Sequence, residues 1–252
     1  MRQRLSARKC AMRTPGSRSV AFGAFLSVLC GTAAPAVSAN IRPVAYPTLP
    51  PMVDRAQAVV PDGWQSSSLV WGDLNGDGHK DFVLLLRDND PALRPSQSFD
   101  TNPYMLAIYF SDGDGQYRRI ASNHRLIPRH DSPELEDVID SVTGGGVWIE
   151  NGTLLVSLGL FSGTSSGMGS RGFTFRWQDG HFVLIGFDSY EVNRADGSIS
   201  SDSYNFLTGR RKHGVSSIDS DQTKFTWSSF ARHRAPTLNE MGDGTEFDPT
   251  AQ

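Results

Sequence analysis

The sequence from position 72 to position 86 reads Gly72-Asp73-Leu74-Asn75-Gly76-Asp77-Gly78-His79-Lys80-Asp81-Phe82-Val83-Leu84-Leu85-Leu86. Its first part places oxygen-bearing side chains at alternate positions of a glycine-containing loop. Its second part is a short apolar run directly after turn residues, which is typical of a buried β-strand. The stretch therefore predicts a β fold in which a loop of oxygen donors leads into a core strand.

The spacing of the donors in this loop indicates a calcium site. Calcium takes six to eight oxygen ligands, and a D-x-N-x-D-G pattern supplies side chains at positions 1, 3 and 5 with a glycine for the sharp turn. Here the side-chain ligands are Asp73, Asn75 and Asp77, followed by the carbonyl of His79 and the carboxylate of Asp81. Position 12 is a leucine, so the loop is not an EF-hand. We expect one structural Ca²⁺; the alternative is a hydrated Asp/Asn/Gly turn.

These residues resemble a known repeat. Residues 72–84 are similar to the loop and strand of FG-GAP or VCBS-type repeats, the calcium-bearing blades of integrin-like β-propellers. Residues 106–117, Leu-Ala-Ile-Tyr-Phe-Ser-Asp-Gly-Asp-Gly-Gln-Tyr, are similar to the partner strand and turn of such a repeat. The resemblance covers about residues 69–122 and implies one calcium-bearing β unit. A propeller needs four or more blades, and the sequence shows one copy.

A looser resemblance covers most of the chain. The order of Val60-Pro61-Asp62-Gly63-Trp64, the GDLNGDG loop, residues 173–186 and Asn205-Phe206-Leu207-Thr208-Gly209 resembles a group of exported bacterial proteins to which no function is assigned. It implies export and brings no catalytic residues.

The first 39 residues predict a signal peptide. Basic residues precede an apolar segment at 20–34, and Val37-Ser38-Ala39 ends in the small residues that a signal peptidase accepts. The apolar segment is shorter than the roughly 20 residues of a membrane span, so we expect a periplasmic or secreted protein with no membrane attachment after cleavage. Met12 is an alternative start. Cys10 and Cys30 both lie in the signal, which leaves the mature chain without a thiol.

Removal of the signal changes the charge of the chain. The whole sequence has 24 Lys and Arg and 27 Asp and Glu residues. The signal carries six of the basic residues and none of the acidic ones, which leaves a net charge of −9 with histidines neutral. An acidic surface disfavours nucleic acids and anionic membranes as partners and favours cations.

The remaining sequence predicts an all-β protein of antiparallel sheets, either a sandwich or a partial propeller-like stack. We expect a Pro-rich lead-in at 40–63, a β domain at 64–234 and a disordered tail at 235–252. Residues 133–140 could form one or two helical turns, and the Gly/Ser-rich stretch 161–172 predicts a mobile connection. The predicted strands are 67–71, 82–87, 104–110, 117–122, 146–150, 154–161, 173–177, 182–187 and 225–229. Asn151-Gly152 and Asp179-Gly180 predict tight hairpin turns.

The sequence predicts no catalytic residue. Gly163-Thr164-Ser165-Ser166-Gly167 matches the G-x-S-x-G nucleophile pattern, and Asp188 and His213 follow in the order of α/β-hydrolases. That pattern requires a helix directly after the serine, whereas here glycines and a strand follow. The histidines show no HxH or HExxH spacing, so zinc or iron has no support.

We therefore expect an exported calcium-binding protein with a binding or structural role, whose ligand is a protein or a carbohydrate. The alternative is a hydrolase of cell-wall or extracellular polysaccharide that uses carboxylates such as Asp188 and Glu191 as acid and base. We expect the five tryptophans to belong to the core, although one or two on a sheet face could stack on sugars; they are Trp64, Trp71, Trp148, Trp177 and Trp227. The basic cluster at 210–213 could contact an anionic partner or be solvated.

Overall fold

The computed structural model describes residues 42–96 and 99–251. The expected signal peptide at 1–39, with Cys10 and Cys30, lies outside the described residues. None of the helices in the described ranges is long and apolar enough to cross a membrane.

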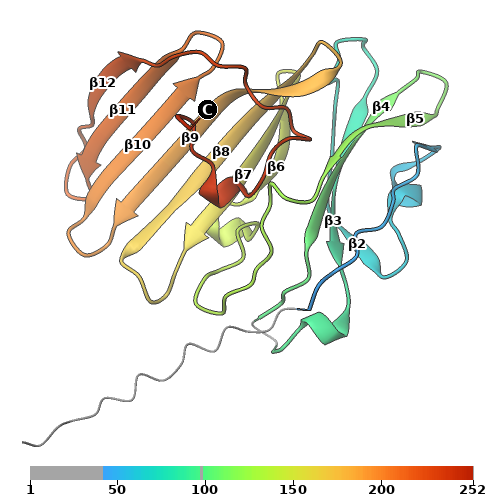
Figure 1. Cartoon of the computed structure of the whole chain (residues 1–252), viewed down its shortest axis with the longest axis horizontal. Coiled ribbons are helices and arrows are strands. Elements are labelled where there is room, and N and C mark those ends of the chain that lie inside the picture. The colour runs from blue at the N-terminus through green and yellow to red at the C-terminus, as the bar shows by residue number, and fades with distance from the viewer. Residues whose placement is uncertain (1–41, 97–98, 252) are drawn as a thin grey trace, which may run out of the picture. The chain divides into compact units, whose positions relative to one another are not determined.

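The protein is all-β and contains two antiparallel sheets, as predicted (Figure 1). Apart from β1, each strand pairs with strands adjacent to it in the sequence, so both sheets are meanders. The five-stranded sheet has the order β1 (Met52–Val53), β5 (Tyr117–Asn123), β4 (Tyr104–Ser111), β3 (Asp81–Asp88) and β2 (Trp64–Gly72). The seven-stranded sheet curls into a half-barrel. Its order is β12 (Lys224–Ser229), β11 (Arg210–Ser217), β10 (Ser198–Asn205), β9 (His181–Asn193), β8 (Gly167–Gln178), β7 (Thr153–Phe161) and β6 (Gly146–Glu150).

The two predicted hairpin turns are confirmed. Asn151 and Gly152 connect β6 to β7 with φ values of 50° and 71°. Asp179 and Gly180 connect β8 to β9 with φ values of 53° and 79°. Positive φ at both central residues is the geometry whose twist matches that of the flanking strands.

The five-stranded sheet is covered on both faces, which explains the continuous apolar runs in β3 and β4. Alternate residues such as Val83 and Ile108 belong to a core shared with the seven-stranded sheet. The residues between them, such as Phe82 and Tyr109, form a second cluster on the opposite face. A strand that is buried on both faces has no polar side to show in its sequence.

The lead-in at residues 42–63 supplies the cover of that second face. Leu49, Val53 and Val59 are buried in the second cluster, and the Tyr109 hydroxyl donates to the Pro50 carbonyl at 2.7 Å. The prediction that the packed domain begins at residue 64 is therefore wrong. Prolines keep this segment extended, as expected. Its few apolar side chains nevertheless pack against the second face of the five-stranded sheet.

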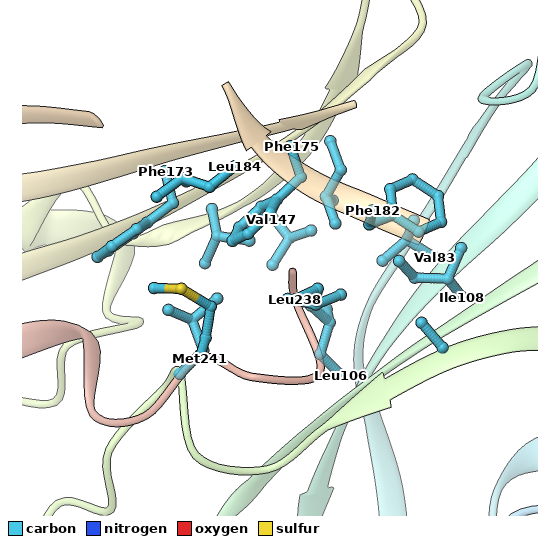
Figure 2. Packing of buried hydrophobic residues seen from close by; sticks show 14 of the residues in the cluster. Val83, Leu106, Ile108, Val147, Phe173, Phe175, Phe182, Leu184, Leu238 and Met241 are labelled. Atoms are coloured by element: carbon cyan, nitrogen blue, oxygen red, sulfur yellow. The ribbon is translucent and has the colours of Figure 1, made fainter. Parts of the chain in front are cut away.

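The tail is also part of the fold, and the prediction of disorder at 235–252 is wrong for residues 235–251. Leu238 and Met241 are buried in the shared core. Figure 2 shows both side chains facing Phe173 and Phe175 of the seven-stranded sheet, with Leu106 of the other sheet nearby. Backbone bonds hold the segment in place, including one from the Leu238 N–H to the Phe182 carbonyl at 2.8 Å.

Three further expectations differ from the structure. The stretch 161–172 is a connection only up to residue 166, because β8 begins at Gly167. Residues 133–140 contain turns and no helix. Strands β10 and β11 were not predicted, because their residues are mainly serine and charged and lack the alternation that marks a half-buried strand.

Candidate functional site

The predicted calcium loop connects β2 to β3 and lies where the two sheets meet. A Cβ atom added to Gly72 would lie 2.5 Å from Cγ2 of Ile149 in β6. A Cβ atom on Gly152, in the β6–β7 turn, would lie 3.6 Å from the carbonyl oxygen of Asp73. The backbone of the loop therefore approaches the seven-stranded sheet directly, and its conformation influences the junction.

Hydrogen bonds within the loop orient its donors. The Asp73 carboxylate accepts the N–H groups of Gly76 at 2.7 Å and Gly78 at 2.9 Å. Asp77 Oδ1 accepts the His79 N–H at 2.8 Å, and Asp77 Oδ2 accepts a hydrogen bond from the Asn75 side chain at 2.8 Å. The bond from His79 and then that from Asn75 lower the pKa of Asp77. Asp77 is therefore ionised at neutral pH, as a calcium ligand must be.

Asp81 has a different environment from the other predicted ligands, because it is fully buried. Its carboxylate accepts the N–H of Leu74 at 2.8 Å and the N–H of Ser111 at 3.0 Å. Burial raises the pKa of Asp81, and the two hydrogen bonds oppose this rise. Asp81 thus connects the start of the loop to the end of β4.

The donor chemistry of the loop fits a hard cation. Asp73, Asn75 and Asp77 present oxygen ligands, and each carboxylate oxygen that accepts one hydrogen bond retains a second lone pair. Across residues 42–96 and 99–251, however, no three His, Cys, Asp or Glu side chains converge as a metal-holding group. The imidazole of His79 points to the neighbouring turn, where a Cβ on Gly113 would lie 3.1 Å from its Nε2. The predicted calcium ligand of this residue is its backbone carbonyl and not its ring.

A large groove lies at one end of the inner face of the seven-stranded sheet. We call this face inner because it carries Phe173, Phe187 and Tyr204 of the shared core. Four residues further along their strands, Gly169, Glu191 and Ser200 stand opposite one another and share that face. Together with segments 124–138 and 243–246, this end of the sheet encloses about 1120 Å³.

The lining of the groove is apolar with acidic groups. The apolar side chains on this face or wall include those of Leu135, Leu160 and Val215. Leu135 and Val215 are each 49% exposed, so the groove holds accessible apolar surface. The exposed carboxylates that line it are those of Asp131, Glu136, Glu191 and Glu246.

The two arginines that line the groove are engaged by backbone carbonyls. Arg125 Nη2 donates to the Asn239 carbonyl at 3.2 Å. Arg129 Nη1 donates to the Arg42 carbonyl at 2.6 Å, and its Nε donates to the Thr101 carbonyl. These bonds help to fix the wall of the groove. A guanidinium bonded to a neutral carbonyl keeps its charge, but the four exposed carboxylates outnumber the two arginines.

The candidate hydrolase residues are not brought together. Ser165 lines the groove, but its hydroxyl donates to the Gly167 carbonyl at 3.3 Å and the chain continues into β8. His213 Nδ1 lies 2.9 Å from Asp202, not from Asp188. Asp188 and Glu191 line different hollows, because an odd spacing along β9 places them on opposite faces. These two carboxylates do not form an acid and base pair.

Sequence reasoning found the loop but not the groove. The groove is assembled from the ends of several strands, the segment 124–138 and the C-terminal residues 243–246, and no local pattern marks such a surface.

No protein-family model, curated protein or solved structure matches this chain.

Proposed function

We propose that the protein is an exported calcium-binding protein that holds a mainly apolar ligand with a positive charge in the groove of the seven-stranded sheet. The observation that carries this proposal is the groove itself, with about 1120 Å³ of space and accessible apolar side chains. Concave sites with apolar walls and a few polar groups are the usual form of ligand sites, and this volume is slightly above their usual range.

The charge of the ligand follows from the carboxylates. Four exposed carboxylates, among them Glu136, Glu191 and Glu246, line the groove against two arginines, so its lining is negative in balance. A ligand with an anionic group would meet repulsion there, whereas a cationic group would gain favourable interactions that fall with added salt.

The calcium loop has a supporting role in this proposal. It lies between β2 and β3 and contacts the β6–β7 hairpin, so Ca²⁺ would stabilise the junction of the two sheets. Asp73, Asn75, Asp77, the His79 carbonyl and Asp81 are the residues proposed to hold it. The supporting facts are the oxygen donors, the ionised Asp77 and the position of the loop.

The proposal is tested with two ligands that share an alkyl chain and differ in charge. Titration calorimetry with residues 40–252 would compare dodecyltrimethylammonium with dodecyl sulfate, both below the concentrations at which they form micelles. We expect the cationic compound to bind more tightly, and we expect Glu191→Gln to reduce the difference between the two.

Matched variants locate the binding. Val215→Asn makes the lining polar, whereas Ile218→Asn makes the same kind of change at a residue that is 65% exposed outside the groove. Val215→Asn should weaken binding of the cationic compound several-fold and Ile218→Asn should not. Equal effects of the two variants, or tighter binding of the sulfate, would contradict the proposal.

A further inference from the structure

A second hollow lies on the outer face of the seven-stranded sheet, opposite the groove. It has a volume of about 420 Å³, which is within the usual range for small-molecule sites. The residues at its base are small and polar, namely Ser157, Ser170, Gly172, Ser201 and Ser203. A Cβ on Gly172 would meet no atom closer than 3.7 Å, so the absence of a side chain there leaves real space.

Aromatic rings stand at both ends of one row across this hollow. The pairing of the strands places Tyr190, Ser201, Gly214 and Phe225 in register on β9, β10, β11 and β12. Tyr190 is 43% exposed and Phe225 is 51% exposed. The backbones of their strands are three spacings apart, or roughly 14 Å, so the two aromatic side chains flank the serine-lined hollow.

The Phe225 ring is held against the sheet rather than free in solvent. A Cβ on Gly214 would lie 2.9 Å from Cε1 of Phe225, so only a glycine allows the ring to lie there. Trp227, two residues along β12 and 58% exposed, lies on the same face. The edge of the sheet thus presents two positioned aromatic rings.

Two cations accompany these rings. Lys212 Nζ lies 3.8 Å from the centroid of the Phe225 ring, and the Arg210 guanidinium lies 4.8 Å from that of Trp227. Within residues 42–96 and 99–251, neither cation forms a salt bridge, although the mature chain carries a net charge of −9. Ser203 on β10 stands between Lys212 on β11 and Asp188 on β9, and the Asp188 carboxylate adds a hydrogen-bond acceptor to the hollow.

We propose that this outer face binds an acidic polysaccharide. Its sugar rings stack on Phe225 and Trp227, and its carboxylates pair with Lys212 and Arg210. Serine hydroxyls and Asp188 supply hydrogen bonds to the sugar hydroxyls along the hollow. The ring faces favour a sugar over a simple anion, and the two cations favour an acidic sugar over a neutral one. This site is separate from the groove, so neither proposal depends on the other.

The test is titration of residues 40–252 with oligogalacturonate, with a neutral maltooligosaccharide and polyglutamate as comparison ligands. We expect binding of oligogalacturonate that weakens with added salt, and little binding of the other two. Lys212→Gln should weaken binding about tenfold, the effect of losing one charge-assisted hydrogen bond. Phe225→Ala should also weaken it, and the melting temperature of each variant shows that it is folded.

Lys224→Gln is the matched control, because Lys224 pairs with Val215 on the inner face of the same hairpin. It removes the same charge and should leave the binding constant unchanged. The proposal is overturned if oligogalacturonate does not bind, if polyglutamate or the neutral sugar binds as well, or if Lys224→Gln and Lys212→Gln have equal effects.

Discussion

The carboxylate of Asp81 accepts the backbone N–H of Ser111 at 3.0 Å, although the two residues are 30 positions apart in the sequence. This bond connects the end of the candidate calcium loop to the end of β4. Since Asp81 also accepts the Leu74 N–H, the loop is fixed to the five-stranded sheet at both of its ends. An ion bound by the loop would therefore stabilise the sheet and not only the loop.

Calcium should raise the stability of the protein through this loop. Calcium that binds only the folded state, at a hundred times its dissociation constant, adds about 2.7 kcal/mol to the free energy of unfolding. We expect a one-to-one calorimetric isotherm and a higher melting temperature in calcium than in chelator, both lost in Asp77→Ala. Asp114→Ala, in the neighbouring acidic turn, is the control. No heat and no shift in the unaltered chain would mean that the loop is only a turn.

Gly72 should be required for the contact between the sheets. In Gly72→Ala the new methyl group would collide with Cγ2 of Ile149, a branched and stiff side chain. We expect a loss of about 1–3 kcal/mol in unfolding free energy, measured by urea denaturation. The double variant with Ile149→Ala removes the clashing atom, so Gly72→Ala should then cost less. If Gly72→Ala lowers the unfolding free energy equally with and without Ile149→Ala, the close contact between these two residues does not determine the stability.

Leu238 should contribute to global stability despite its place near the end of the chain. It is 1% exposed in the shared core. Leu238→Ala should lower the unfolding free energy by about 2–5 kcal/mol, the range for large-to-small core substitutions. Val142→Ala, at a residue 91% exposed, should change it by less than about 0.5 kcal/mol. A tail that contributes nothing to the core would give the same small value for both variants.

Asp202 should give a pH-dependent contribution to stability. Partial burial alone would raise its pKa, but hydrogen bonds from Arg211 at 2.7 Å and His213 at 2.9 Å outweigh this and lower it. The stabilisation is therefore complete above the unfolded pKa of about 4 and is lost as the pH falls through the lower folded value.

The variant Asp202→Asn tests this contribution. Because the pair is partly exposed, we expect it to cost about 1 kcal/mol at neutral pH. The difference from the unaltered chain in denaturation experiments should shrink towards zero in acid. Asp188→Asn, on the other face of the sheet, serves as the control for a change of net charge. A cost for Asp202→Asn that stays constant with pH would show that the ion pair is not its cause.

The sequence predicts a strand where one face is apolar and the other polar, or where both faces are apolar. The hairpin of β6 and β7 is placed within one residue, because Asn151-Gly152 marks its turn and branched residues mark its strands. In β10 only Tyr204 is buried, and the rest of the strand lies beside the groove or the outer hollow. A strand that lines a binding surface lacks the apolar alternation that reveals strands.

The same limit applies to the ends of the chain and to the candidate site. Leu238 and Met241 are isolated apolar residues in a polar tail, and only the existing core shows why they are buried. The order of donors in the loop is local and can be read directly from Asp73 to Asp81. The groove depends on which strand ends the folded chain places together, and this is a property of the curl of the sheet.

The meander order of both sheets has a consequence for the kinetics of folding. Almost every strand pairs with its neighbour in sequence, so hairpins can form one after another with small loop-closure entropy. The C-terminal segment adds a contact of much longer range, because the Asn123 side chain donates to the Leu238 carbonyl across 115 positions. The docking of Leu238 and Met241 is thus expected to follow the formation of both sheets.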